Sequence, residues 1–236
     1  MACDLMVACD LDGTLLPATD LPALHELAAK CCLVYATGRS AELANEAIAE
    51  EGLPVPQWLI SDCGTAIQDA TGKLLVGYWR LISQTWYRYA VQQALRGVRG
   101  LKLQESTRQS LFKVSFYTAG ASVLEVARKA LHAQGLDANL VYSHDGTTGL
   151  LDAIPYLAGK GSATHFLKHH LCCKRAVFAG DSGNDLDVID HGIPFVLVGN
   201  AAPDVRARVQ DYGSGEVYLA AGHHFAGVLE GLAHFT

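Results

Sequence analysis

The alternation of short apolar runs with helix-like stretches is the feature that most constrains how this chain folds. Near the N-terminus we expect strands and helices in the order 5–9, 20–30, 32–36, 40–51 and 58–60, with a strand first and last. Strands that alternate with helices in this way form a parallel sheet covered by helices. The same alternation returns from residue 161 to the C-terminus, so we expect both ends of the chain to have this α/β organisation.

The middle of the chain follows a different pattern. We expect hairpins in the glycine-containing stretch 64–80, helices over 84–96 and 121–134, and strands over 113–117, 139–143 and 150–154. This order is typical of an α+β unit rather than of a parallel sheet. We therefore predict an α/β fold with a doubly wound, parallel-sheet (Rossmann-like) core over residues 1–77 and 157–236. An α+β domain, residues 78–156, is inserted into this core.

Charge and hydropathy argue against two classes of partner. The chain has 18 Lys and Arg residues and 24 Asp and Glu residues, a net charge of −6, so we expect no nucleic-acid-binding surface. The longest runs without a charged residue, 191–203 and 217–229, have 13 residues each. A membrane-spanning helix needs roughly 18 apolar residues, so we expect no membrane span. Aspartates interrupt the apolar N-terminus, which also argues against a signal peptide.

The cysteines indicate the compartment. Seven are present, Cys31–Cys32 and Cys172–Cys173 are adjacent pairs, and no C-x-x-C occurs. This arrangement suits neither a disulfide framework nor a zinc site. We expect reduced thiols in a cytoplasmic protein. The sequence leaves the oligomeric state open, a monomer included.

Polar motifs follow the expected core strands or begin the helices next to them. They are Asp10-Leu11-Asp12-Gly13-Thr14, Thr37-Gly38-Arg39-Ser40, Lys160-Gly161 and Gly180-Asp181-Ser182-Gly183-Asn184-Asp185. Ligands of doubly wound sheets bind beyond the carboxyl ends of the strands, so we expect these motifs to converge on one rim.

The residue types at this rim indicate phosphate chemistry. Carboxylates that converge repel one another and favour a cation, and few protein oxygen ligands suit Mg²⁺. Glycine-rich turns can direct backbone N–H groups at an anion, and Lys160 can offset its charge. An aspartate can attack phosphorus, and a second carboxyl group two residues on can donate and accept a proton.

Each of these residues also has a purely structural interpretation. Asp10 and Asp12 could form an N-cap and turn, Thr37 could cap the next helix, and Lys160 could be a solvated lysine. Asp181 and Asp185 could cap a short helix, and Arg39 could form a surface ion pair. The occurrence of all four motifs in one chain favours the chemical interpretation over the structural one.

Taken together, the motifs resemble those of the haloacid dehalogenase superfamily of phosphohydrolases. The resemblance implies a nucleophile, Asp10, and a general acid and base, Asp12. It also implies that Thr37 and the Gly38 N–H hold the phosphoryl group and that Lys160 neutralises it. The implied Mg²⁺ site comprises Asp10, Asp12 (through its carbonyl oxygen), Asp181 and Asp185, with Asn184 in support. We include Asn184 and Arg39 among the substrate-binding candidates.

The place of the insertion narrows the resemblance to members with a large α/β cap domain. Five stretches are similar to sucrose-phosphate phosphatases: 35–40, 112–117, 151–155, 160–164 and 198–203. In the expected cap, Lys113 and Ser115 share one face of a strand and, with Asp152, are candidates to bind a sugar. The chain departs from the sucrose-phosphatase pattern at Gly13, where that pattern usually has Asn. The segment 143–149 has no matching counterpart.

The expected activity is Mg²⁺-dependent hydrolysis of a small-molecule sugar phosphate. The preferred candidate substrate is sucrose 6-phosphate or a related glycosyl phosphate. Two alternatives remain within the fold: a phosphatase of another sugar phosphate, of the mannosyl-phosphoglycerate or hexose phosphate type, and a phosphomannomutase-like phosphotransferase. A third is a non-catalytic receiver module, but such modules carry the phosphorylated Asp after the third strand and lack an inserted domain.

Overall fold

The computed structural model describes residues 4–144, 148–210, 212 and 215–236. The chain forms two compact units, Met1–Leu75 with Lys160–Thr236, and Val76–Gly159. In the segment 143–149, residues Asp145, Gly146 and Thr147 lie outside the described residues. None of the helices among the described residues has the length and hydropathy needed to cross a membrane.

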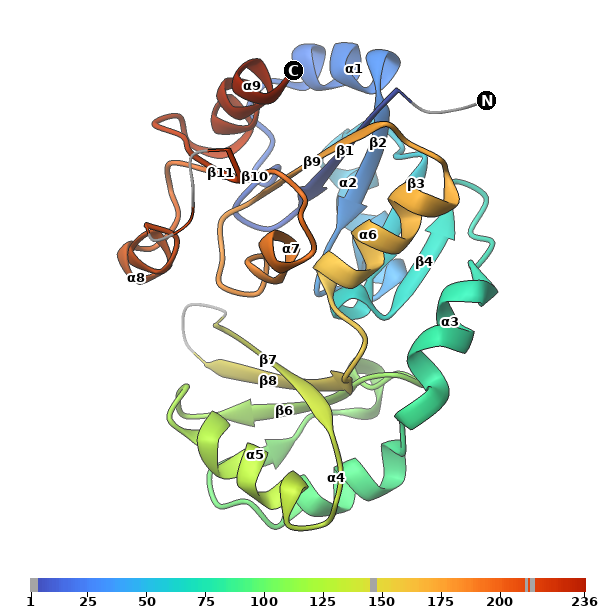
Figure 1. The fold of residues 1–236 in the computed structure, drawn as a ribbon, viewed down its shortest axis with the longest axis vertical. Coiled ribbons are helices and arrows are strands. Elements are labelled where there is room, and N and C mark those ends of the chain that lie inside the picture. The colour runs from blue at the N-terminus through green and yellow to red at the C-terminus, as the bar shows by residue number, and fades with distance from the viewer. Residues whose placement is uncertain (1–3, 145–147, 211, 213–214) are drawn as a thin grey trace. The chain divides into compact units, whose positions relative to one another are not determined.

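The first unit is built on a seven-stranded sheet in the order β11-β10-β9-β1-β2-β3-β4 (Figure 1). Its strands are β1 (Leu5–Asp10), β2 (Cys32–Ala36), β3 (Trp58–Ser61), β4 (Ala66–Asp69), β9 (Arg175–Gly180), β10 (Phe195–Leu197) and β11 (Val217–Leu219). All neighbouring strands are parallel except β3 and β4, which pair antiparallel. The predicted doubly wound α/β fold is confirmed.

Helices cover both faces of this sheet. They are α1 (Leu21–Lys30), α2 (Ala41–Glu50), α6 (Lys160–His170), α7 (Asp187–Asp190), α8 (Pro203–Arg208) and α9 (His224–Phe235), with a 3₁₀ turn, η1 (Asp62–Gly64). The helices α1, α2 and α9 pack on alternate residues of the strands, such as Val7 and Tyr35, through side chains that include Leu24 and Phe225. Helices α6 and α7 lie in front of the sheet in Figure 1.

Local sequence signals account for the helix ends. The Asp20 carboxylate accepts a hydrogen bond from Ala23 N at 3.1 Å at the start of α1, and Ser40 Oγ accepts one from Leu43 N at 3.4 Å at the start of α2. Each satisfies a backbone donor that the helix itself leaves unpaired. Gly52 follows α2 with a φ of +69°, a conformation that glycine adopts without steric cost.

The second unit has a four-stranded antiparallel sheet in the order β5-β6-β8-β7. Its elements are α3 (Val76–Ile82), η2 (Ser83–Thr85), α4 (Arg88–Arg96), β5 (Leu101–Leu103), η3 (Ser106–Arg108), β6 (Val114–Thr118), α5 (Val123–His132), β7 (Ala138–His144) and β8 (Gly149–Pro155). Helices α4 and α5 pack on one face, where they bury Val114, Phe116 and Leu151. The residues between these, such as Ser115 and Asp152, therefore project from the other face.

Two local expectations were wrong in part. Within 64–80, β4 does pair antiparallel with β3, but residues Val76–Ile82 form helix α3, so Gly77 lies in a helix and not in a turn. Burial of Tyr78 and Ile82, both 0% exposed, outweighs the low helix propensity of glycine. The helix expected over 84–96 starts only at Arg88, because Trp86 is extended and its indole N–H donates to the Leu111 carbonyl at 3.0 Å.

Candidate active site

The sheet brings the predicted motifs together because their strands are neighbours. Asp10 is the last residue of β1, and Asp181 follows β9, which pairs directly with β1. Thr37 follows β2 on the other side of β1. Lys160 is the first residue of α6. Parallel strands end at the same edge of a sheet, so residues far apart in the sequence meet there.

A buried lysine joins two carboxylates at the centre of this edge. Lys160 Nζ lies 2.8 Å from Asp10 Oδ1 and 2.7 Å from Asp185 Oδ1, and the lysine side chain is only 3% exposed. The second oxygen of Asp185 accepts hydrogen bonds from the Ser182 backbone N–H at 3.1 Å and from its hydroxyl at 3.0 Å. Buried charges are tolerated only when they are paired and hydrogen-bonded in this way.

A third carboxylate, that of Asp181, lies beside the two that Lys160 contacts. Oxygens of Asp10, Asp181 and Asp185 lie within 4.8 Å of one another. Burial, followed by the negative charge of Asp185, raises the pKa of Asp181 to about 7. Burial also raises the pKa of Asp10, although Lys160 opposes the shift. Burial therefore disfavours the charged forms of these carboxyl groups, and a cation beside them would favour those forms.

The oxygen set fits a divalent cation. Asp181 Oδ1 is buried and has no hydrogen-bond partner among the described residues. An unsatisfied buried carboxylate oxygen, beside two further carboxylates, is what a hard cation with oxygen ligands requires. The three aspartates were predicted as metal ligands from the sequence. The side chain of the fourth predicted ligand, Asp12, lies outside this cluster.

Gly13 shapes the wall of the cluster. Its φ is +81°, and a Cβ atom at this position would lie 2.3 Å from Asp181 Oδ2. Any larger residue would meet both a backbone strain and a steric clash with the carboxylate unless the surrounding atoms shift. The departure from the sucrose-phosphatase pattern at this position is thus matched by a close approach of the backbone to Asp181.

A strained turn holds the Thr37 loop. Asp62 and Cys63 have φ values of +51° and +58°. Their N–H groups donate to the carbonyls of Arg39 at 2.8 Å and Thr37 at 3.1 Å. Non-glycine residues in this conformation are uncommon and concentrate at functional sites. No sequence signal pointed to Asp62 or Cys63, because a backbone contact leaves no mark on the residue type.

Within the loop, Thr37 is fully buried and its Oγ1 accepts a hydrogen bond from Arg39 N at 3.1 Å. The hydroxyl proton can therefore point elsewhere, as needed to donate to an anion. Gly38 lies against Cys63, whose Sγ would be 3.5 Å from a Cβ at position 38. The sequence placed Thr37 and Gly38 correctly at the end of a strand.

Asp12 and Arg39 form a pair beside the cluster. Arg39 Nε donates to Asp12 Oδ2 at 2.9 Å, and Nη2 donates to Oδ1 at 2.5 Å. The pair is partly exposed to solvent, with side-chain exposures of 36% for Arg39 and 55% for Asp12. The Arg39 guanidinium, predicted as a substrate-binding group, is therefore directed at the second aspartate of the first motif.

Asn184 and Ser182 complete the turn after β9. The Ser182 hydroxyl oxygen lies 2.6 Å from Asn184 Oδ1 and 3.0 Å from Asp185 Oδ2. Its one proton can be donated to either of these two oxygens. Asn184 therefore supports the turn that carries Asp181 and Asp185. The part played by Ser182 was not predicted, although it lies inside the motif.

Asn200 and His224 were also missed. Asn200 Nδ2 donates to the Gly13 carbonyl at 2.7 Å, while its Oδ1 accepts from His224 N at 2.8 Å. His224 Nδ1 lies 3.0 Å from the same Gly13 carbonyl, so that this nitrogen must be the protonated one. Together the two side chains tie the loop after β1 to the start of α9. Only the 198–203 stretch, noted as a resemblance without an assigned role, pointed to this region.

In the second unit, Lys113, Ser115 and Asp152 are all buried, with exposures of 6%, 2% and 9%. Ser115 and Asp152 are directly opposite each other on β6 and β8, and the Ser115 hydroxyl lies 2.5 Å from Asp152 Oδ1. These side chains project from the sheet face opposite α4 and α5. The structure thus brings the three predicted sugar-binding candidates to one face of one sheet.

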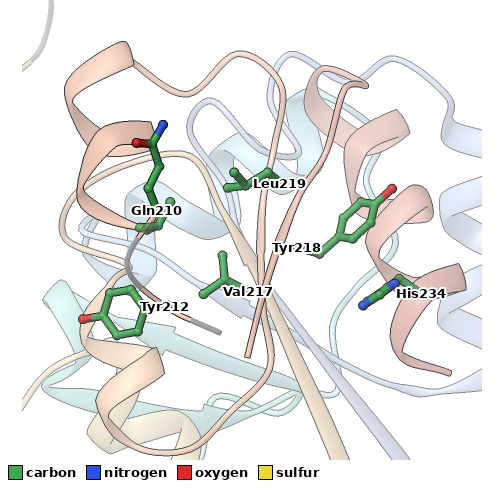
Figure 2. A pocket seen from close by; sticks show the side chains of 7 residues that line it. Gln210, Tyr212, Val217, Tyr218, Leu219 and His234 are labelled. Atoms are coloured by element: carbon green, nitrogen blue, oxygen red, sulfur yellow. The ribbon is translucent and has the colours of Figure 1, made fainter. Parts of the chain in front are cut away.

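A separate cavity lies at the edge strand β11. It has a volume of about 450 Å³, and Tyr218 of β11 and His234 of α9 lie side by side in its wall, with ring centroids 4.9 Å apart (Figure 2). Its lining includes none of the residues predicted from the motifs. The strand ends, and not this cavity, therefore carry the candidate chemistry.

The fold and the site define the class of protein. The chain has a doubly wound sheet with an inserted α+β unit, and a buried Asp–Lys–Asp cluster and a Thr loop lie at the strand ends. These features are those of a haloacid dehalogenase superfamily phosphatase, which is a phosphoric monoester hydrolase. Residues 3–236 match the family model of sucrose-6F-phosphate phosphohydrolase. The chain belongs to this family of sugar-phosphate phosphatases, and the resemblance noted from the motifs is confirmed.

Individual relatives agree. A HAD-like hydrolase of Nitrosococcus oceani is 36% identical over 98% of this chain and 71% of its own. The mannosylfructose-phosphate phosphatase of Agrobacterium fabrum is 27% identical over 98% of this chain and 96% of its own. The structure of the sucrose-phosphatase from Synechocystis sp. PCC6803, in complex with sucrose and phosphate, is similar with a TM-score of 0.87 and 28% identity over 100% of this chain and 98% of its own. The chain spans 50–60% of the length of the plant sucrose-phosphatases it matches.

The buried lysine should be critical for stability. For Lys160→Met we expect the free energy of unfolding to fall by about 3–5 kcal/mol, because the buried carboxylates lose their counter-charge. This loss of stability should be larger at pH 8 than at pH 5.5. Because the pKa values of the buried carboxyl groups are raised, the folded protein takes up protons as the pH falls, and the uncompensated charge is neutralised. Urea denaturation in EDTA measures both effects. Lys30→Met, which removes a surface ion pair with Glu26, is the control; an equal loss in both variants would contradict the prediction.

The Asn200 contact should hold the loop after β1. In Asn200→Asp, the carboxylate cannot donate to the Gly13 carbonyl, so we expect a loss of about 1–3 kcal/mol in stability. We also expect faster hydrogen–deuterium exchange in residues 11–16, measured by mass spectrometry. Asn45→Asp on the exposed surface of α2 controls for the added charge. Unchanged exchange in 11–16 would show that Asn200 does not hold this loop.

Proposed function

We propose that the protein is a Mg²⁺-dependent phosphatase that hydrolyses a sugar phosphate through an aspartyl-phosphate on Asp10. The observation that carries this proposal is the buried cluster of Asp10, Lys160, Asp185 and Asp181, with a carboxylate oxygen of Asp181 left without a hydrogen-bond partner among the described residues. A hydrolase of phosphate esters needs a nucleophile, a counter-charge for the phosphoryl group and a cation site in one place.

In the first step, a carboxylate oxygen of Asp10 attacks phosphorus while the bond from phosphorus to the sugar oxygen breaks. The Asp12 carboxyl group donates its proton to the sugar oxygen, and the sugar leaves as an alcohol. In the second step, water attacks phosphorus and gives a proton to the Asp12 carboxylate. The bond from phosphorus to Asp10 breaks, which releases inorganic phosphate and restores both carboxyl groups.

The phosphoryl group is held by residues that already lie at this edge of the sheet. In the proposal, the Thr37 hydroxyl and the Gly38 N–H donate to its oxygens, and Lys160 offsets its charge. Asp10, Asp181 and Asp185, with the carbonyl oxygen of Asp12, hold the cation. Mg²⁺, when bound, draws electron density from the phosphoryl oxygens and neutralises the carboxylates.

The two units have different roles in this proposal. The unit that contains β1 and β9 is the catalytic core, and the Val76–Gly159 unit is the cap that recognises the sugar. Lys113, Ser115 and Asp152 are the proposed sugar-binding groups, because ammonium, hydroxyl and carboxylate groups can hydrogen-bond sugar hydroxyls.

The proposed substrate is sucrose 6-phosphate or a related glycosyl phosphate. The matched family and the sucrose-bound Synechocystis structure support the first choice. The Agrobacterium relative, whose length the chain matches over 96%, supports mannosylfructose phosphate as the second. Each is a phosphate of a disaccharide that contains fructose. A phosphomutase that uses the same Asp pair would return the phosphate and accumulate none in solution.

A phosphate-release screen with sucrose 6-phosphate, mannosylfructose phosphate, mannosyl-phosphoglycerate and hexose phosphates tests the function. We expect release that needs Mg²⁺, stops in EDTA and resumes on adding Mg²⁺. Asp10→Asn should lower it by about a thousandfold or more, because the amide cannot act as the nucleophile. Asp190→Asn, an exposed aspartate of α7, is the matched control. No release from any substrate, or full activity of Asp10→Asn, would overturn the proposal.

Sugar recognition is tested separately with Asp152→Asn. Loss of the carboxylate should raise the KM for the preferred sugar phosphate by about tenfold, as expected for a lost hydrogen bond to a charged group. The KM for p-nitrophenyl phosphate, which has no sugar, should rise less. Asp137→Asn, at an exposed site of the same unit, is the control. Equal changes in KM for both substrates would count against a sugar contact.

A further inference from the structure

The pairing of Arg39 with Asp12 has a geometry that stability does not require. Two guanidinium N–H groups meet the two oxygens of one carboxylate, at 2.9 Å and 2.5 Å. Ion pairs this exposed contribute at most about 1 kcal/mol to folding. A two-point contact nevertheless fixes the direction and rotation of the carboxylate, which a single hydrogen bond does not.

Both partners start from loops of the site. Arg39 belongs to the Thr37 loop, and its backbone is held on both sides: its N–H donates to Thr37 Oγ1, and its carbonyl accepts from Asp62 N. Asp12 belongs to the loop after β1, whose Gly13 carbonyl is held by Asn200 and His224. The two-point contact between the Arg39 guanidinium and the Asp12 carboxylate, called the fork below, therefore joins two independently anchored loops. It can thus orient Asp12 relative to Thr37.

We propose that Arg39 is a positioning residue for Asp12, which aims the carboxyl group at the oxygen of the leaving sugar. This inference rests on the proposed function, in which Asp12 donates a proton to that oxygen and later takes one from water. A carboxyl group on a mobile side chain at the solvent edge would sample many directions. The fork restricts it to one, and positioning of this kind is a large part of catalysis by proton transfer.

The inference separates two kinds of substrate. A sugar alkoxide is a poor leaving group and depends on the proton from Asp12, whereas p-nitrophenolate leaves without one. Loss of the fork should therefore slow a sugar phosphate more than an aryl phosphate. If Arg39 only bound the phosphoryl group, which both substrates share, both would slow equally.

The experiment compares kcat for the sugar phosphate found in the screen with kcat for p-nitrophenyl phosphate in Arg39→Lys, which keeps the charge but loses the fork. We expect the ratio of the two kcat values to fall by about tenfold or more. Arg39→Gln, which loses the charge too, should lower the ratio at least as far and serves if the lysine variant does not fold. Arg96→Lys, at an exposed arginine of α4, should leave the ratio unchanged.

A double-mutant cycle with Asp12→Asn makes the test specific. If Arg39 acts through Asp12, Arg39→Lys should have no further effect on the ratio in the Asp12→Asn background. An unchanged ratio in Arg39→Lys, or an equal effect with and without the Asp12 carboxylate, would overturn the inference. In either case the wild-type protein still releases phosphate. Absence of release from every substrate would instead refute the proposed function.

Discussion

The contact of Lys160 with Asp10 and Asp185 is the interaction on which the rest of the site depends. One ammonium group, almost fully buried at the start of α6, lies between a carboxylate at the end of β1 and one in the turn after β9. Without it, the ends of β1 and β9 would each present uncompensated negative charge to the interior. With it, they can stay side by side, with their oxygens close enough to those of Asp181 to hold a cation.

The neighbouring loops are held mainly by backbone contacts. The strained Asp62–Cys63 turn donates to the carbonyls of the Thr37 loop, and Asn200 and His224 hold the Gly13 carbonyl. Such contacts fix the positions of the loops through main-chain atoms.

Prediction from the sequence was most accurate where one local signal dominates. Ser40 and Gly52 mark the ends of α2 because a cap hydrogen bond and a left-handed turn depend on residue type alone. It was least accurate where a distant contact decides, as with Trp86, whose indole N–H bonds to Leu111, and with Gly77, which the burial of its neighbours keeps in a helix. The motif residues stood out by their types, but Asp62 acts through a backbone N–H group that almost any residue carries, and the side chains of Asn200 and His224 bond to the Gly13 carbonyl, a backbone group far away in the sequence.

The sequence by itself determined the fold class and the set of chemical groups. Hydrophobic periodicity sets where strands and helices form, and the order of the polar motifs sets which side chains follow which strands. Only the tertiary structure decided how those groups pair. It placed Lys160 between Asp10 and Asp185, left an oxygen of Asp181 without a donor among the described residues, and directed Arg39 to Asp12. These pairings depend on distances between segments remote in the chain, which packing of the whole sheet and its loops sets.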